Sequence, residues 1–155
     1  MPKLDLNAIA QTNATGYPAP FDEPVRGRSY RRLAPATGLE KLRASHVVLE
    51  PGAWSSQRHW HRDIDELLVM ISGEAVLVED QGETLLRVGD VAAWPAGEQN
   101  GHHLQNRSKA PCVFVVAAAG DYETDGGEYR DIDMVFEPDG YFRKDGTRYE
   151  TDRIP

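Results

Sequence analysis

Two histidines and a glutamate are the residues of this chain whose types and spacing most readily suggest chemistry. His59 and His61 lie two residues apart, and Glu66 follows five residues after His61. Side chains alternate between the faces of an extended strand, so both imidazoles would point to one side and Trp60 to the other. Two imidazole nitrogens and a carboxylate oxygen that converge on one point form a good site for a divalent first-row metal ion.

A solvated strand surface is the alternative interpretation of the same residues, because the stretch from Arg58 to Glu66 is rich in charge. Glu66 begins an apolar run that ends at Ile71, and this run predicts the next strand. A tight connection between the two strands would bring the carboxylate beside the imidazoles. The rest of the chain has to decide between a metal site and a polar surface.

A third imidazole ligand would have to come from another part of the chain. His46 lies in the middle of a predicted strand with no partner spaced near it, which favours a structural role. His102 and His103 are adjacent, so on a strand only one of them can face His59 and His61. The residues alone leave His102 and His103 open as alternatives.

The elements that must position these residues belong to one all-β domain. With 155 residues, 40% hydrophobic and 27% charged, the chain has the length and composition of a globular protein with its own core. Short apolar segments alternate with turn residues at the spacing typical of a sandwich or barrel. No stretch carries a helical stripe of three turns. The predicted strands cover residues 29–33, 39–49, 66–71, 74–79, 84–88, 91–94, 102–107 and 113–118.

The two ends of the chain differ from this pattern. We expect residues 1–27 to form an extended arm whose apolar side chains pack on the domain or on a partner subunit. The barrel is expected at 28–120, followed at 121–155 by a C-terminal loop and a small hairpin packed on it. Within that last segment, the acidic stretch 121–133 predicts a surface loop.

Charge and composition exclude several classes of function. The net charge of −8 argues against binding to a nucleic acid or to an anionic membrane surface, because a protein needs a basic face to bind either of them. No apolar run reaches the roughly 18 residues that span a bilayer, and the N-terminus lacks the apolar core of a signal peptide, so a cytoplasmic protein is expected. The single cysteine, Cys112, lies in an apolar run and is expected to be a buried structural thiol. Apolar residues on both faces of 67–71 predict a homodimer.

Two motifs anchored by glycines carry a resemblance to a known family. The first combines His-x-His with a glutamate between two glycines, and its residues are Gly52, His59, His61, Glu66 and Gly73. The second combines Pro-x-Gly with a histidine and an asparagine, and its residues are Gly89, Pro95, Gly97, His102 and Asn106. On these residues the chain resembles the cupin superfamily, and more closely small bacterial single-domain cupins of the cupin 2 conserved-barrel type. It departs from the pattern by one extra residue before His59 and two extra residues before His102.

The resemblance implies a jelly-roll β-barrel that holds one divalent metal ion through His59, His61, Glu66 and His102. The family spacing from histidine to asparagine is kept only by His102 with Asn106, so the resemblance selects His102. Zinc, iron, manganese and nickel all accept this ligand set. The implied function acts on a small polar or anionic metabolite, by oxygenase, isomerase or lyase chemistry. The alternative is a non-catalytic module that binds a metal and a small ligand, or a structural metal site.

Neighbouring residues carry further expectations. Alternation places Gln57 on the face of His59, where it would touch a metal-bound water, and places Leu68 and Met70 beside Glu66 as an apolar wall. We expect Asn106 to hydrogen-bond to a ligand imidazole from behind. The sequence leaves open whether four other side chains reach the pocket, as aromatic walls or acid–base groups: Trp54, Trp94, Tyr30 and Glu79.

Overall fold

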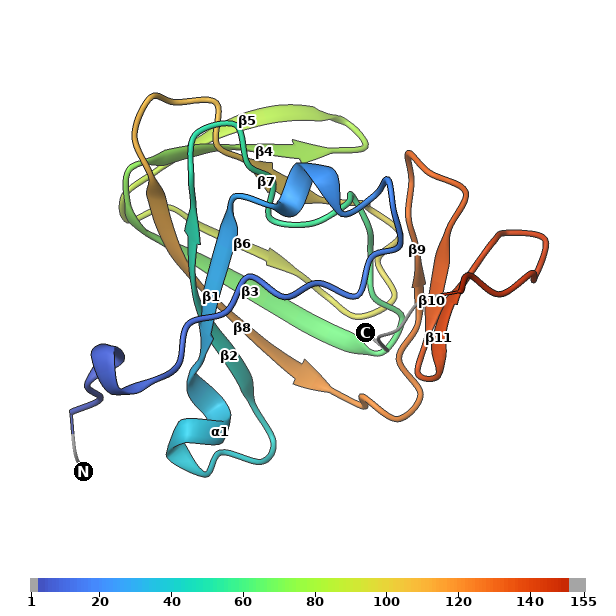
Figure 1. Ribbon diagram of the computed structural model, residues 1–155, viewed down its shortest axis with the longest axis horizontal. Helices are drawn as coiled ribbons and strands as arrows, with labels where there is room; N and C mark the ends of the chain where they lie inside the picture. Colours follow the sequence, from blue (N-terminus) through green and yellow to red (C-terminus); the bar gives the residue numbers. More distant parts are fainter. Residues whose placement is uncertain (1–2, 151–155) are drawn as a thin grey trace.

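The computed structural model describes residues 3–150, which fold around two antiparallel sheets that face each other across a common core (Figure 1). The larger sheet has the order β1 (Arg28–Arg32), β2 (Arg43–Leu49), β8 (Cys112–Gly120), β3 (Ile64–Ser72) and β6 (Val91–Trp94). The smaller sheet has the order β5 (Gly82–Arg87), β4 (Glu74–Glu79) and β7 (His103–Gln105). The all-β barrel expected from the sequence is confirmed.

Alternation of buried and exposed side chains explains why these segments form strands. Along β3, Leu68 and Met70 are buried, whereas Leu67 before them and Ile71 after them face solvent. The inward side chains of both sheets meet in one core. That core includes Val47, Leu49, Leu68, Met70, Ala75, Leu77, Leu86, Leu104 and Phe114. The chain passes from β3 to β4 at Gly73, whose positive φ of 72° and close approach to Pro111 both require glycine.

Short helical segments take up part of the predicted strands. The segment expected at 29–33 ends at Arg32, and the helix α1 (Leu33–Thr37) follows it and ends at Gly38 in the left-handed conformation. The strand expected from residue 39 therefore begins only at Arg43. Two 3₁₀ turns, η1 (Leu6–Ala8) and η2 (Glu23–Val25), lie in the arm. Within residues 3–150, no helix is long and apolar enough to cross a membrane.

The N-terminal arm packs on the barrel, running along β1 and then toward the third sheet (Figure 1). Thr12 exchanges two backbone hydrogen bonds with Tyr30, of 3.0 and 2.8 Å. Further along, the Gln57 amide donates a 2.7 Å hydrogen bond to the carbonyl of Phe21. Of the expected arm and C-terminal segment, residues 1–2 and 151–155 lie outside the described part of the chain.

A third sheet closes one end of the barrel, with the order β11 (Gly140–Phe142), β10 (Val135–Glu137) and β9 (Gly127–Glu128) (Figure 1). The expectation of a surface loop over 121–133 is wrong in its middle, because Asp125 and Tyr129 are buried. Gly127 explains the close packing: a β-carbon there would lie 1.9 Å from the carbonyl oxygen of Trp60. The sheet has its own aromatic cluster, formed by Tyr129, Met134, Phe136 and Tyr141 with Tyr17 and Phe21 of the arm.

Two polar groups expected from the sequence are buried in structural positions. Cys112 is fully buried and free, and burial raises its pKa to about 11, so the expectation of a structural thiol is confirmed. Asn106 is also fully buried, but it holds a loop and not an imidazole. Its amide donates to the carbonyls of Leu49, at 2.8 Å, and Ala110, at 2.9 Å, and its oxygen accepts from the backbone of Ser108 at 3.0 Å. The expected support of a ligand imidazole by Asn106 is therefore wrong.

We predict that Asn106→Ala lowers the free energy of unfolding by about 2 to 4 kcal/mol, because it leaves buried carbonyls without a donor. Urea unfolding measures this, and metal content should stay at the wild-type level. Ser108→Ala is the matched control, since it removes bonds from the exposed side of the same loop and should cost much less. A loss of bound metal in Asn106→Ala at unchanged stability would contradict this assignment.

Candidate metal centre

His59 and His61 lie in an extended segment between β2 and β3 that is not a regular strand. His59 is held there by an isolated bridge, in which its backbone exchanges hydrogen bonds with His102 of 3.3 and 2.9 Å. A regular strand, the condition from which the alternation argument started, is not formed here, but the consequence of the argument holds. The two rings lie on one side of the segment, and their Nε2 atoms are 3.2 Å apart.

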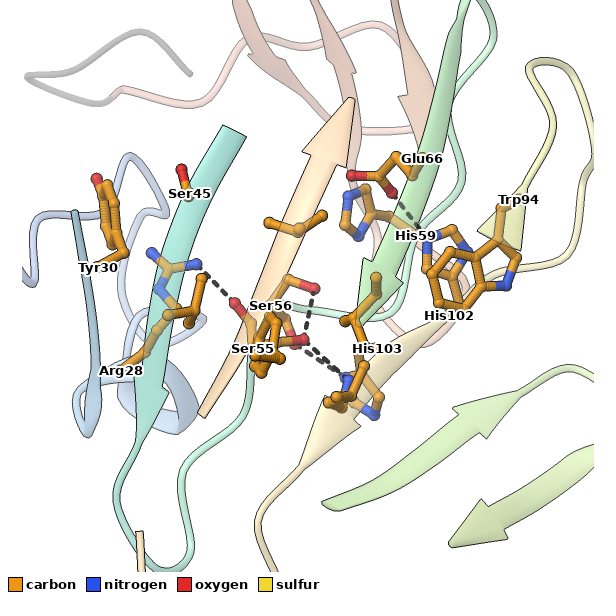
Figure 2. Close-up of a pocket in the computed structure, with 15 residues that line it drawn as sticks. Arg28, Tyr30, Ser45, Ser55, Ser56, His59, Glu66, Trp94, His102 and His103 are labelled. Carbon is orange, nitrogen blue, oxygen red and sulfur yellow. Dashed lines mark hydrogen bonds and ion pairs between the residues drawn. The ribbon is translucent and has the colours of Figure 1, made fainter. Parts of the chain in front are cut away.

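Glu66 projects from β3 into the same place (Figure 2). The ligand atoms of His59, His61 and Glu66 lie within 4.8 Å of one another. Oε2 of Glu66 lies 3.9 Å from Nε2 of His61 and 2.9 Å from Nε2 of His102. His102 is outside that group of three, yet it adjoins the carboxylate. Two donors bound to one ion at about 2.1 Å lie about 3 to 3.5 Å apart, so these separations suit a single small cation.

The hydrogen bonds behind the imidazoles determine which ring nitrogen is free. In each ring Nδ1 faces an oxygen that can only accept, so Nδ1 carries the hydrogen and Nε2 of the neutral ring presents a lone pair. The acceptors are the Gln57 carbonyl for His59, at 2.8 Å, the Asp125 carboxylate for His61, at 2.6 Å, and the Asn100 carbonyl for His102, at 3.0 Å. The Nε2 atoms of the three imidazoles and the carboxylate of Glu66 therefore all point acceptor lone pairs at one another. Acceptors repel at short distance, so a cation between them is needed to hold them together. The donor set therefore fits a divalent metal ion.

The pKa values agree with this arrangement. Burial lowers the pKa of His59 to about 3, so its ring is neutral at pH 7. Burial alone would raise the pKa of Glu66, but its contact with His102 and the nearby imidazoles bring it to about 2. Burial works against protonation of His61 as well, but the hydrogen bond to Asp125 and the negative charges of Glu66 and Asp125 together outweigh it and raise the pKa. At neutral pH, His59 and Glu66 are in the forms that bind metals.

Asp125 is the functional residue that sequence reasoning missed. The residue is only 8% exposed, and its second carboxylate oxygen accepts a 3.1 Å hydrogen bond from the backbone of Asp63. The carboxylate thus connects the C-terminal segment to His61 and orients that ring. The signal that could have revealed it is the pair Gly126-Gly127, which follows at once and marks a close approach of two backbones.

The adjacent histidine, His103, has different partners. Its Nδ1 lies 2.9 Å from the carbonyl of Ser56, and its Nε2 lies 3.0 Å from the amide nitrogen of Gln105. Both of its ring nitrogens are thus engaged away from Glu66. His102 lies against Trp94, with ring centroids 3.9 Å apart and planes 6° apart. These contacts favour His102 over His103 as the third imidazole.

A cavity of about 280 Å³ lies against this group (Figure 2). Leu68, Trp94 and Tyr30 line it, whereas Met70 belongs to the core and Glu79 binds the indole of Trp94 at 3.0 Å. Gln57 was expected to touch a metal-bound water, but it does not line the cavity. Its side-chain amide donates instead to the carbonyl of Phe21 in the arm, so this expectation is wrong. The remaining lining is Arg28, Ser45, Val47, Ser55, Ser56, His59, Glu66, His102, His103, Leu104, Phe114 and Val116.

Comparison with known proteins identifies the family. The model of the Cupin_2 family, the cupin domain, matches residues 45–118. A crystal structure of a sugar phosphate isomerase of the cupin superfamily from Silicibacter pomeroyi DSS-3 is 40% identical in sequence and has a TM-score of 0.91. The similarity covers 99% of this chain and 100% of that one. This chain belongs to the cupin superfamily.

Two further solved structures share the cupin fold with it. A putative sugar phosphate isomerase from Acidithiobacillus ferrooxidans is 20% identical with a TM-score of 0.72, and the similarity covers 81% of this cupin and 83% of that chain. A Cupin 2 conserved barrel domain protein from Salinispora arenicola is 22% identical with a TM-score of 0.55, covering 77% and 87%. None of the curated proteins with which the sequence was compared matches it.

We predict that Asp125→Asn weakens metal binding by about 10- to 100-fold, because it removes the charge that orients His61. His61→Ala should lose most of the metal, and His103→Ala should lose none. Elemental mass spectrometry of untagged protein, purified without chelators, gives the metal content, and competition with a chelator gives the affinity.

Glu123→Gln is the matched control, since it removes one negative charge from an exposed position of the same loop. It should bind metal as the wild type does. If His103→Ala loses the metal while His102→Ala keeps it, the assignment of His102 is wrong.

Proposed function

We propose that this cupin is a divalent-metal-dependent isomerase that acts on a small, sugar-like hydroxy-carbonyl compound. The observation that carries the proposal is the convergence of His59, His61 and Glu66 on one point beside the cavity, with His102 next to the carboxylate. In this proposal those four residues hold one ion, whose identity stays open among zinc, iron, manganese and nickel. The similarity to a sugar phosphate isomerase over nearly the full length of both chains supports isomerisation ahead of oxygenase or lyase chemistry.

The chain's own residues would prepare the site for this reaction. A bound divalent ion supplies a Lewis acid that polarises a carbonyl or hydroxyl oxygen of the substrate. Asp125 fixes the ring of His61, and the stacked Trp94 fixes that of His102. Moving a proton between neighbouring carbons also needs an acid–base group beside the substrate. Outside the proposed ligand set, Tyr30 is the candidate of the cavity lining for this role, because both ring nitrogens of His103 are held by Ser56 and Gln105.

We predict that the metal-loaded protein interconverts aldose and ketose forms of a five- or six-carbon sugar or sugar phosphate. Product formation is followed by NMR, with each of the four metals in turn. Activity should fall to background in His61→Ala and after chelation, and should return when metal is restored. Melting that shifts with a ligand while no product forms would replace this proposal with a non-catalytic binding module.

We also propose that the protein forms a homodimer through the outer face of β3 and β6. Leu67, Ile71 and Val91 are 43%, 49% and 57% exposed on these paired strands, and a second copy of the face would cover them. A location in the cytoplasm stays a prediction from the sequence.

Light scattering at micromolar concentration should therefore give the mass of a dimer. Val91→Asp, which puts a charge at the centre of the face, should give a monomer with unchanged metal content. A monomeric wild-type protein would refute the dimer.

A further inference from the structure

Arg28 is a cation of the cavity that has no acidic partner. Its guanidinium donates 2.6 Å and 3.4 Å hydrogen bonds to the carbonyls of Ser55 and Ala14. Its Nε is buried and has no hydrogen-bond partner, and within residues 3–150 no carboxylate lies at ion-pair distance from it. A partly buried charge without a counter-ion is costly, so the position calls for an anion.

The shape of the guanidinium says which anion would fit. Arginine carries five N–H donors in a planar fork, and the two carbonyls occupy only part of them. The fork matches two oxygens of a phosphate or of a carboxylate, and such paired charge-assisted bonds are among the strongest hydrogen bonds in proteins. Neither carbonyl neighbour neutralises the positive charge. The residue is thus prepared for an oxyanion.

The surroundings of Arg28 add hydroxyl groups. Figure 2 shows Arg28, Tyr30 and Ser45 together at the end of the cavity formed by β1 and β2, away from Glu66 and His102 at the other end. The Ser45 hydroxyl lines the cavity and makes no hydrogen bond to another described residue. Apolar side chains form the rest of the wall, and they are Val47, Leu68, Leu104, Phe114 and Val116.

The charges at the two ends suit a dianionic ligand. Among the residues that line the cavity, Arg28 is the one arginine or lysine and Glu66 is the one residue with a carboxylate side chain. With a divalent ion at the proposed ligands, the cavity would carry about two positive charges, against about −1.5 to −2 for a phosphate monoester at pH 7. A sugar with an oxyanion at one end and hydroxy-carbonyl oxygens at the other would satisfy both ends.

We propose that Arg28 and Ser45 form an oxyanion subsite, which binds the phosphate or carboxylate of the substrate at the end of the cavity away from the imidazoles. The substrate class is therefore a small sugar phosphate or sugar acid, and neutral sugars bind poorly. The inference rests on the proposed function for the reacting end of the substrate. Binding of an oxyanion at Arg28 does not require that function.

Calorimetric titration with inorganic phosphate tests the subsite in the wild type and five variants. Arg28→Met should weaken phosphate binding at least tenfold, and Arg28→Lys should restore part of it. Ser45→Asp should weaken binding similarly, because it puts a negative charge at the end of the cavity where the anion would bind. Arg32→Met is the matched control on the same strand, exposed and outside the cavity, and should bind as the wild type does.

The effect of each substitution on folding and the place where phosphate binds are measured separately. Arg28 also ties the arm through Ala14, so Arg28→Met can lower the melting temperature, whereas Ser45→Asp leaves those hydrogen bonds in place. His61→Ala should still bind phosphate if the anion lies at Arg28. Unchanged phosphate affinity in both Arg28→Met and Ser45→Asp would overturn the subsite, as would loss of binding in His61→Ala alone.

Substrate panels distinguish this inference from the proposed function. Aldose phosphates and sugar acids should bind through Arg28, and their relative affinities decide between phosphate and carboxylate. Phosphate binding that depends on Arg28, without turnover of any sugar, keeps the subsite and rejects the isomerase. Equal kcat/KM for a free sugar and its phosphate, unaffected by Arg28→Met, keeps the isomerase and rejects the subsite.

Discussion

The candidate metal centre depends on one constraint, which is that the lone pairs of its imidazole nitrogens and its carboxylate face one another. Nε2 of His59 lies 3.2 Å from Nε2 of His61, and Nε2 of His102 lies 2.9 Å from the carboxylate of Glu66. Acceptors this close repel unless a positive charge lies between them. The arrangement persists because each imidazole is held from behind through Nδ1, and the second carboxylate of the site, Asp125, does this for His61. The fold thus fixes the ring nitrogens in advance of any cation.

The supports come from regions that are far apart in the sequence. Gln57 and Asn100 supply carbonyls from two loops, whereas Asp125 comes from the segment that leads into the third sheet. The barrel core and the cluster of the third sheet are separate, and Asp125 of the segment between them holds the ring of His61. The C-terminal segment is therefore part of the site, although its sequence has the acidic, glycine-containing character of a surface loop. Close packing of Gly127 on the backbone of Trp60 holds it there.

Patterns in the sequence correctly predicted those features that depend only on residues close together along the chain. Alternation gave the strands from Glu66 onward and the common side of His59 and His61, because both follow from backbone geometry. It failed for Gln57, whose amide turns to the arm, and for Asn106, whose amide closes a loop. These partners lie 36 and 57 residues away, and no periodicity encodes them. Asp125 was missed for the same reason, at a separation of 64 residues from His61.

The N-terminal arm has a consequence for how such a protein can diverge. The carbonyl of Ala14 accepts hydrogen bonds from both Arg28 and the hydroxyl of Tyr30, so the arm helps to set the positions of two cavity residues. The part of the arm around Ala14 has no residue in the barrel core, whereas Phe21 further along the arm binds Gln57, which supports the ring of His59. Insertions or substitutions around Ala14 can therefore alter the Arg28 end of the cavity while the imidazole end is kept. Variation of ligand preference among relatives is free to accumulate in this segment, with the inherited chemistry left in place.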